Sequence, residues 1–138
     1  MGLRKYLGLN RRRHSRYKAT VDVEFHVWDS AKRTPRTGKN RGRLTDISPM
    51  GACLQTNHTL IDGHHILLDN DPEGQTPVVL TLPTPEEGEQ WTIEAQVLWY
   101  NRIEAKRQYQ FDVGLSFADL SPSERGRLLA FLDSLPTT

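Results

Sequence analysis

Alternation of apolar and polar residues is the dominant pattern along this chain. In residues 20–28, TVDVEFHVW, valine or phenylalanine occupies every second position, and mostly polar residues lie between them. Because successive side chains of a strand point to opposite faces, the pattern predicts a β-strand with one buried face. Residues 29–42 are basic and rich in turn formers, which predicts a loop or long hairpin tip. Further strands are predicted at about 42–48, 51–56, 64–69, 77–82, 91–100 and 108–117.

The end of the chain changes to a helical period. Ser121 can cap the first turn, Pro122 suits the first helical position, and Glu124 completes a capping box. Leucines at helical spacing then form one apolar stripe, and Pro136 ends the segment. About six strands with short connections and one terminal amphipathic helix favour a mostly β fold. We expect a small antiparallel six-stranded β-barrel with a C-terminal α-helix on its outside or across one end.

The composition is that of one globular domain. The chain has 138 residues, of which 36% are hydrophobic and 25% charged, and its mean hydropathy is −0.61. No apolar run approaches the length of a membrane span, and the first residues lack the apolar stretch of a secretory signal, so we expect a cytoplasmic protein. The single cysteine, Cys53, cannot form an internal disulfide and is expected to be packed rather than nucleophilic.

Charge is distributed unevenly along the chain. Residues 1–43 hold 13 Lys or Arg against 3 Asp or Glu, whereas the remaining residues hold 5 against 14. Either the two halves attract each other in the fold, or the basic end binds an anion. We expect residues 1–17 to form a flexible basic arm and residues 18–138 to form the folded domain. The segment NRRRHSRYK at 10–18 is the most basic part of the arm.

A second informative segment is LTDISPMGACLQT, residues 44–56. In an extended chain Asp46 and Ser48 project to one face and Ile47 to the other. Gly51 can adopt a positive φ angle, or allow another group to approach the backbone closely. The same residue types are also those of an ordinary turn, so this segment alone does not identify a binding site.

Together the two segments resemble the PilZ domain family. Arg12 and Arg16 have Arg-x-x-x-Arg spacing, and DISPMG reads Asp-x-Ser-x-x-Gly, about 30 residues further on with a strand between them. A strand ending in DVGLSF, followed by ADLSPSERGRLLAFL, is similar to the closing strand and helix of that family. The resemblance covers roughly residues 10–135. It implies a PilZ-like split barrel over residues 18–138 that binds the bacterial second messenger cyclic di-GMP, a cyclic dinucleotide.

The chemistry of the residues agrees with this ligand, which carries two phosphates and two guanines. An arginine fork can bond guanine O6 and N7 together or grip phosphate oxygens. Asp46 can accept from the N–H edge of a guanine, Ser48 can bond a phosphate or a base, and Gly51 can leave room for a ring. The resemblance makes Arg12 and Arg16 the paired motif arginines. The complete set of expected ligand-binding residues is Arg11, Arg12, Arg13, Arg16, Asp46, Ser48, Gly51 and Trp99.

Two positions are compatible with the sequence around Trp99. Trp99 shares strand parity with Ile93, Ala95 and Val97, so its default position is in the core. The alternative is a position at the barrel surface, where the indole can stack on a guanine. Both positions remain open at the level of the sequence.

The sequence contains no constellation of nucleophile and base and no phosphate-binding glycine loop, so we expect no enzyme activity. Neither a metal site nor a cofactor is expected, because the nearby histidines 58, 64 and 65 do not share a strand face and DNDPEG lacks the final glutamate of a calcium loop. We expect a receptor that changes conformation on binding cyclic di-GMP and regulates an effector protein. Outputs suggested by the family are motility, pili, exopolysaccharide and virulence. The alternatives are a nucleic-acid-binding module that uses the basic arm, and a PilZ-like interaction adaptor that binds no ligand.

Overall fold

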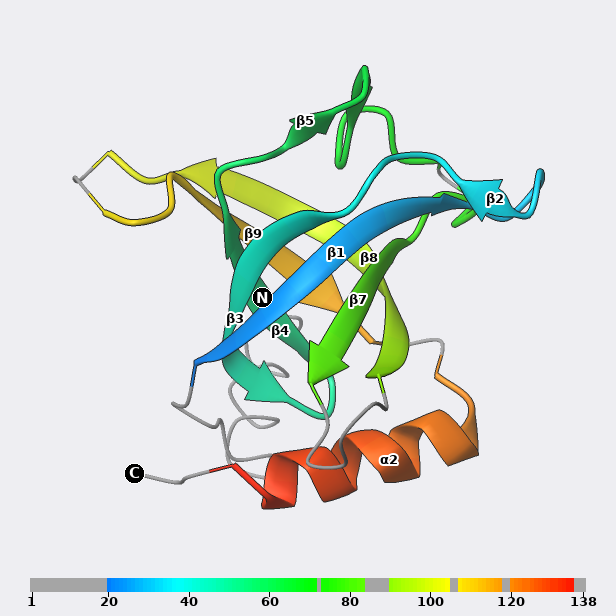
Figure 1. Ribbon diagram of the computed structural model, residues 1–138, viewed down its shortest axis with the longest axis vertical. Coiled ribbons are helices and arrows are strands. Elements are labelled where there is room, and N and C mark those ends of the chain that lie inside the picture. The colour runs from blue at the N-terminus through cyan, green and yellow to red at the C-terminus, as the bar shows by residue number, and fades with distance from the viewer. Residues whose placement is uncertain (1–19, 72, 84–89, 105–106, 118–119, 136–138) are drawn as a thin grey trace, which may run out of the picture.

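The structure, a computed structural model, describes residues 20–71, 73–83, 90–104, 107–117 and 120–135. Within these residues the main sheet has the strand order β2-β1-β3-β4-β9-β8-β7, and β1 also pairs with β7 (Figure 1). The predicted six-stranded antiparallel barrel is therefore confirmed, with the short strand β2 outside it. The bounds are β1 Val21–Asp29, β2 Thr34–Pro35, β3 Asn40–Ser48, β4 Gly51–Thr56, β7 Val78–Pro83, β8 Gln90–Arg102 and β9 Phe111–Ser116.

The interior of the barrel is filled by the inward positions predicted from alternation. On β1 the side chains of Val21, Val23, Phe25 and Val27 are buried, and the polar residues between them point outward. Phe25 is 0% exposed, and burial of a side chain of this size contributes about 1.5–3 kcal/mol to folding. Equivalent apolar residues of the other barrel strands complete the core.

The C-terminal helix α2, Pro122–Asp133, lies across one end of the barrel (Figure 1). Its predicted capping box is confirmed: Glu124 N donates to Ser121 Oγ at 3.2 Å, and Ser121 N donates to Glu124 Oε1 at 3.0 Å. Leu128 and Leu132 are buried against the barrel. Within the described ranges no helix is long and apolar enough to cross a membrane.

A small second sheet lies at the opposite end of the barrel, where β5, Leu60–Ile61, pairs with β6, His64–His65 (Figure 1). The strand predicted over 64–69 was wrong beyond its first two residues, because the segment turns instead. His65 Nδ1 accepts hydrogen bonds from Leu67 N at 3.1 Å and Leu68 N at 3.0 Å. Such side-chain bonds to nearby backbone groups stabilise a turn in competition with a strand.

Candidate functional site

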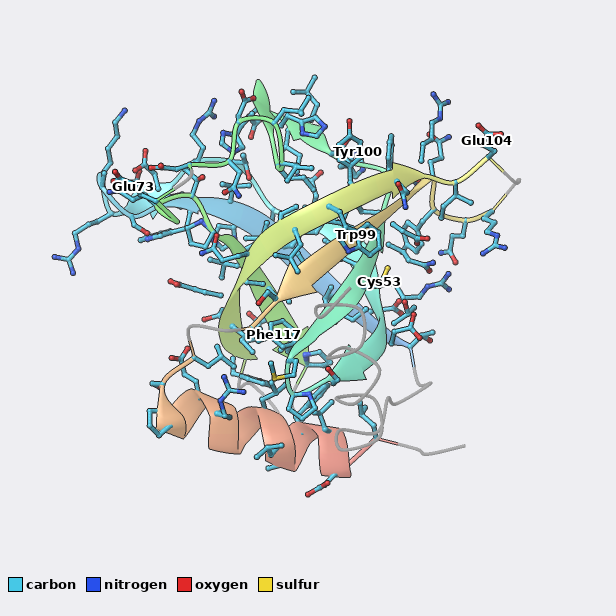
Figure 2. The ribbon with its side chains drawn as sticks, turned by 180° about the vertical axis from the view of Figure 1, so that it is seen from behind. Cys53, Glu73, Trp99, Tyr100, Glu104 and Phe117 are labelled. Carbon is cyan, nitrogen blue, oxygen red and sulfur yellow. The ribbon has the colours of Figure 1, made fainter. Side chains whose placement is uncertain are left out.

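The outer face of β3, β4, β9 and β8 carries small and polar side chains in registered rows. One row is Thr45, Cys53, Gly114 and Trp99; the next is Ser48, Gly51, Ser116 and Gln96. We call these eight residues the platform. In Figure 2 Trp99 and Cys53 lie on the barrel face that is turned toward the reader. Because most of the platform side chains are short, a planar group can approach the sheet closely there.

A bulge in β3 displays the Asp-x-Ser pair at the edge of the platform. Thr45 pairs with Cys53 and Ser48 with Gly51, so β3 has one more residue than β4 between these pairs. Asp46 has a φ of 50°, a left-handed conformation that aspartate adopts more readily than most residues. Ile47 is buried while Asp46 is exposed, in agreement with the opposite faces predicted for these two side chains. Asp46 makes no hydrogen bond or ion pair with the part of the chain that the structure describes.

Ser48 closes the turn between β3 and β4. Its Oγ accepts a hydrogen bond from Met50 N at 3.1 Å and donates one to Gly51 O at 3.4 Å. The distance to Gly51 O is at the long limit of a hydrogen bond, so the hydroxyl can give up this bond and donate to a ligand oxygen instead. The side chain is half-buried at the edge of the platform.

Gly51 allows the close approach of another group, as predicted, and in the described residues that group is the backbone of β9. The φ of Gly51 is not positive, and a Cβ at this position would lie 2.1 Å from the carbonyl oxygen of Leu115 on β9. The glycine is therefore required by the close approach of two strand backbones. The space beside its Cα in the direction of a Cβ is occupied by β9, so the residue serves the fold, and its contact with a ligand ring stays a prediction.

Trp99 lies on the outer face of the barrel, so the predicted default position in the core was wrong. Val97 pairs with Leu115 and Trp99 with Gly114, which leaves Leu98 as the extra residue of a bulge in β8. The bulge reverses the alternation, and the Trp99 side chain is 44% exposed. A Cβ at Gly114 would lie 2.3 Å from Trp99 Cε2 and Nε1, so the indole covers this glycine.

A polar row borders the platform on the side away from Ser48. Arg43 Nε and Nη2 donate to Gln55 Oε1 at 3.1 and 2.8 Å, and Gln55 Nε2 donates to Asp112 Oδ1 at 2.9 Å. The Arg43 guanidinium also lies over the Tyr109 ring, 5.2 Å from its centroid. The sequence analysis missed this ladder of Arg43, Gln55 and Asp112, because in the sequence these are ordinary outward positions of three separate strands.

The first described residues after the basic arm lie close to the Asp-x-Ser pair. Arg11, Arg12, Arg13 and Arg16 lie outside the described residues, but Thr20 is described and Val21 pairs with Leu44, two residues before Asp46. Since β1 and β3 are antiparallel, the chain enters the barrel next to the bulge. Four residues from Thr20 back to Arg16 span at most about 14 Å.

Comparison with known families agrees with this geometry. The PilZ domain model matches residues 10–134, a span that contains both motifs, the barrel and α2. The chain belongs to the PilZ domain family. No curated protein matches the chain. Membership suggests an adaptor that binds cyclic di-GMP, and it is consistent with a receptor rather than a catalyst.

Cys53 occupies the centre of the platform of this PilZ domain. Burial raises the pKa of its thiol to about 11, and the negative charge of Asp112 acts in the same direction. Hydrogen bonds with Thr45 and the Val113 backbone oppose the shift only in part. The centre of the platform therefore stays uncharged at neutral pH, which suits an anionic ligand better than a thiolate would.

The raised thiol pKa predicts slow alkylation of the folded protein. The usual pKa of 9.0 becomes about 11, so near pH 8.5 the folded protein holds roughly a hundredfold less thiolate than the unfolded chain. Iodoacetamide should therefore modify the folded protein about a hundredfold more slowly than the protein in urea, with a rate that rises about tenfold per pH unit between pH 8 and 10. Mass spectrometry of timed samples measures this rate. A plateau near pH 9 would contradict the assigned environment.

Proposed function

We propose that this PilZ domain is a receptor for cyclic di-GMP, an adaptor that binds the messenger on the platform and regulates an effector protein. The observation that carries the proposal is the pairing of Val21 with Leu44, since it places the first residue of β1, four residues after the arm, close to Asp46 and Ser48. An anionic ligand on the platform is then within reach of Arg12 and Arg16 of the same chain. The family membership supports the same ligand.

Each group is suited to a different part of the dinucleotide. Arg12 and Arg16, with Arg11 and Arg13 beside them, bond phosphate oxygens or the O6 and N7 edge of a guanine through two parallel hydrogen bonds. The exposed Asp46 carboxylate accepts from guanine N1–H and N2–H₂. On the platform, Ser48 adds a hydroxyl donor and Trp99 adds an aromatic face.

The bulge in β3 prepares Asp46 for this role. Its carboxylate is exposed and has no partner among the described residues, so no bond within them must break when a guanine binds. For the flexible arm that the sequence predicts, the loss of conformational freedom on binding reduces the net affinity. Neutralisation of its guanidinium groups by the phosphates offsets this cost.

The contacts of Arg125 suggest how binding reaches other surfaces of the domain. Arg125 lies on α2, and its Nη1 donates to Pro49 O at 3.1 Å while its Nη2 donates to Phe117 O at 3.3 Å. Pro49 belongs to the turn that follows Ser48, so a shift of that turn on ligand binding acts directly on the helix. An ordered arm and a shifted α2 present a changed surface to an effector of motility, pili, exopolysaccharide synthesis or virulence.

Titration calorimetry with cyclic di-GMP tests the proposal. The wild-type protein should bind at low micromolar concentration or tighter, and Arg12→Ala or Arg16→Ala should each cost about 1.5–3 kcal/mol, as expected for charge-assisted hydrogen bonds. Lys32→Ala is a matched control, because Lys32 is an exposed cation in the hairpin tip at the opposite end of β1 from the arm. The Lys32→Ala variant should bind cyclic di-GMP with the affinity of the wild type.

Two results would overturn the proposal in different ways. Absence of binding by the wild type, in a folded sample, would indicate an adaptor that acts only through protein contacts. Binding of single-stranded nucleic acid that weakens steeply with salt, without any effect of Asp46→Asn, would indicate the nucleic-acid-binding alternative.

A further inference from the structure

Asp112 is a half-buried carboxylate whose role the two motifs leave unexplained. It lies on the outer face of β9, and its Oδ1 accepts a hydrogen bond from Gln55 Nε2 at 2.9 Å. Its carboxylate also forms a hydrogen bond with the Cys53 thiol. Within the described ranges Asp112 forms no ion pair. The Arg43 guanidinium, which belongs to the same ladder, donates to Gln55 Oε1 instead. An ionised carboxylate has about four acceptor sites, so Asp112 retains capacity to accept further hydrogen bonds beside these two.

A carboxylate in this position is unfavourable for a dianionic ligand unless it accepts hydrogen bonds from that ligand. Cyclic di-GMP offers two sets of donors that suit a carboxylate, N1–H together with N2–H₂ on each of its two guanines. Asp46 can accept from one guanine, which leaves the other without a partner of this kind. Asp46 lies in the bulge beside these rows, and Asp112 is the one carboxylate among the residues of the platform and the ladder.

The position of Asp112 also suits a base that stacks on Trp99. Gly114, beneath the indole, is two residues along β9 from Asp112, so the two side-chain positions are about 7 Å apart on the same face. A purine ring stacked on the exposed indole spans a comparable length. Its Watson–Crick edge can therefore reach the Asp112 carboxylate while its face contacts Trp99.

We propose that Asp112 accepts hydrogen bonds from N1–H and N2–H₂ of a guanine stacked on Trp99, and that it determines the preference for guanine over adenine at this position. Arg43 and Gln55 act as positioning residues, because their hydrogen bonds fix the rotamer of the carboxylate. This inference rests on the proposed function. Adenine presents the unprotonated N1 where guanine presents N1–H, so an adenine at this position faces Asp112 with a lone pair.

The test compares two ligands by calorimetry: cyclic di-GMP, and the 3′,3′ hybrid that carries one guanine and one adenine. The wild type should prefer cyclic di-GMP by about tenfold or more. Asp112→Asn should bind cyclic di-GMP about tenfold or more weakly and lose most of its preference over the hybrid, since an amide can pair with either base. Asparagine retains an oxygen for Gln55, so the thermal midpoint of the free protein should stay close to that of the wild type.

Glu94→Gln is the matched control, because Glu94 is an exposed acid on β8 outside the platform and the ladder. It removes the same charge and should leave the preference between the two ligands unchanged. An unchanged preference in Asp112→Asn, or a rise in affinity for both ligands alike, would overturn the inference while cyclic di-GMP binding by the wild type stands. Failure of the wild type to bind cyclic di-GMP would instead overturn the proposed function.

Discussion

Replacement of Gly51 by alanine is expected to destabilise the fold by about 3 kcal/mol or more. The new Cβ would lie 2.1 Å from the carbonyl oxygen of Leu115 and 3.2 Å from its carbonyl carbon. Both are backbone atoms of β9, so neither can turn aside as a side chain can. β4 must then move away from β9, which strains the backbone pairing between the two strands, including the pair of Gly51 with Ser116. Urea unfolding followed by tryptophan fluorescence measures the loss.

Gly126 provides the matched control for this substitution. It lies within α2, and a Cβ there would meet nothing within 4 Å. Alanine has the higher helix propensity, so Gly126→Ala should stabilise the protein by about 0.5–1 kcal/mol. Equal effects of the two substitutions would contradict the assignment of Gly51 to strand packing. The expected opposite signs would establish that the glycine of the Asp-x-Ser-x-x-Gly motif acts through the fold.

Much of the barrel is predictable from the sequence because burial follows a simple rule there. The inward residues of β1 alternate without interruption, and α2 begins at the residues that the capping box predicts. The segment after His64 is not predictable in this way. Its apolar residues fit a strand, and only the folded geometry brings the imidazole of His65 to the two backbone N–H groups that close a turn.

The two bulges explain most of what the sequence could not predict about the site. An inserted residue reverses the faces of all residues beyond it, and Leu98 is an apolar residue that carries no sign of this role. Parity therefore gives the core as the default position of Trp99 and leaves the surface as the alternative, and Trp99 is found on the surface. The ladder through Arg43, Gln55 and Asp112 depends on the register of three strands, which a single sequence does not contain.

The nearness of the start of β1 to the Asp-x-Ser pair is also a property of the register rather than of spacing along the chain. About 30 residues separate the two motifs in the sequence, including all of β1. β1 and β3 are antiparallel neighbours, paired so that Val21 lies opposite Leu44, two residues before Asp46. A shift of β1 by two residues would preserve its buried face and move Val21 by about 7 Å. The resemblance to a family, not the residue pattern, supplied this part of the prediction.

Replacement of Gly114 by alanine is expected to give the largest loss of ligand affinity from a single change on the platform. The added methyl group would overlap the Trp99 indole, which lies 2.3 Å from its position. Unlike the Leu115 carbonyl beside Gly51, the indole is a side chain with an exposed face, so it can swing away without opening the sheet. The protein should remain folded, but the stacking face is lost, at a cost of about 1–3 kcal/mol per base. Distortion of the platform by the methyl group adds about 1–3 kcal/mol.

A double-mutant cycle separates these two effects. Trp99→Ala should weaken cyclic di-GMP binding by the stacking contribution alone, about 1–3 kcal/mol. In the Trp99→Ala background the methyl group at residue 114 no longer meets an indole, so Gly114→Ala should cost much less than in the wild type, with a coupling of at least about 1 kcal/mol. Calorimetry on the four proteins measures the cycle, and thermal unfolding verifies that each is folded. Additive effects would mean that the contact with Gly114 does not hold Trp99 in a ligand-binding position. Trp99 would then not be the aromatic stacking surface of the platform.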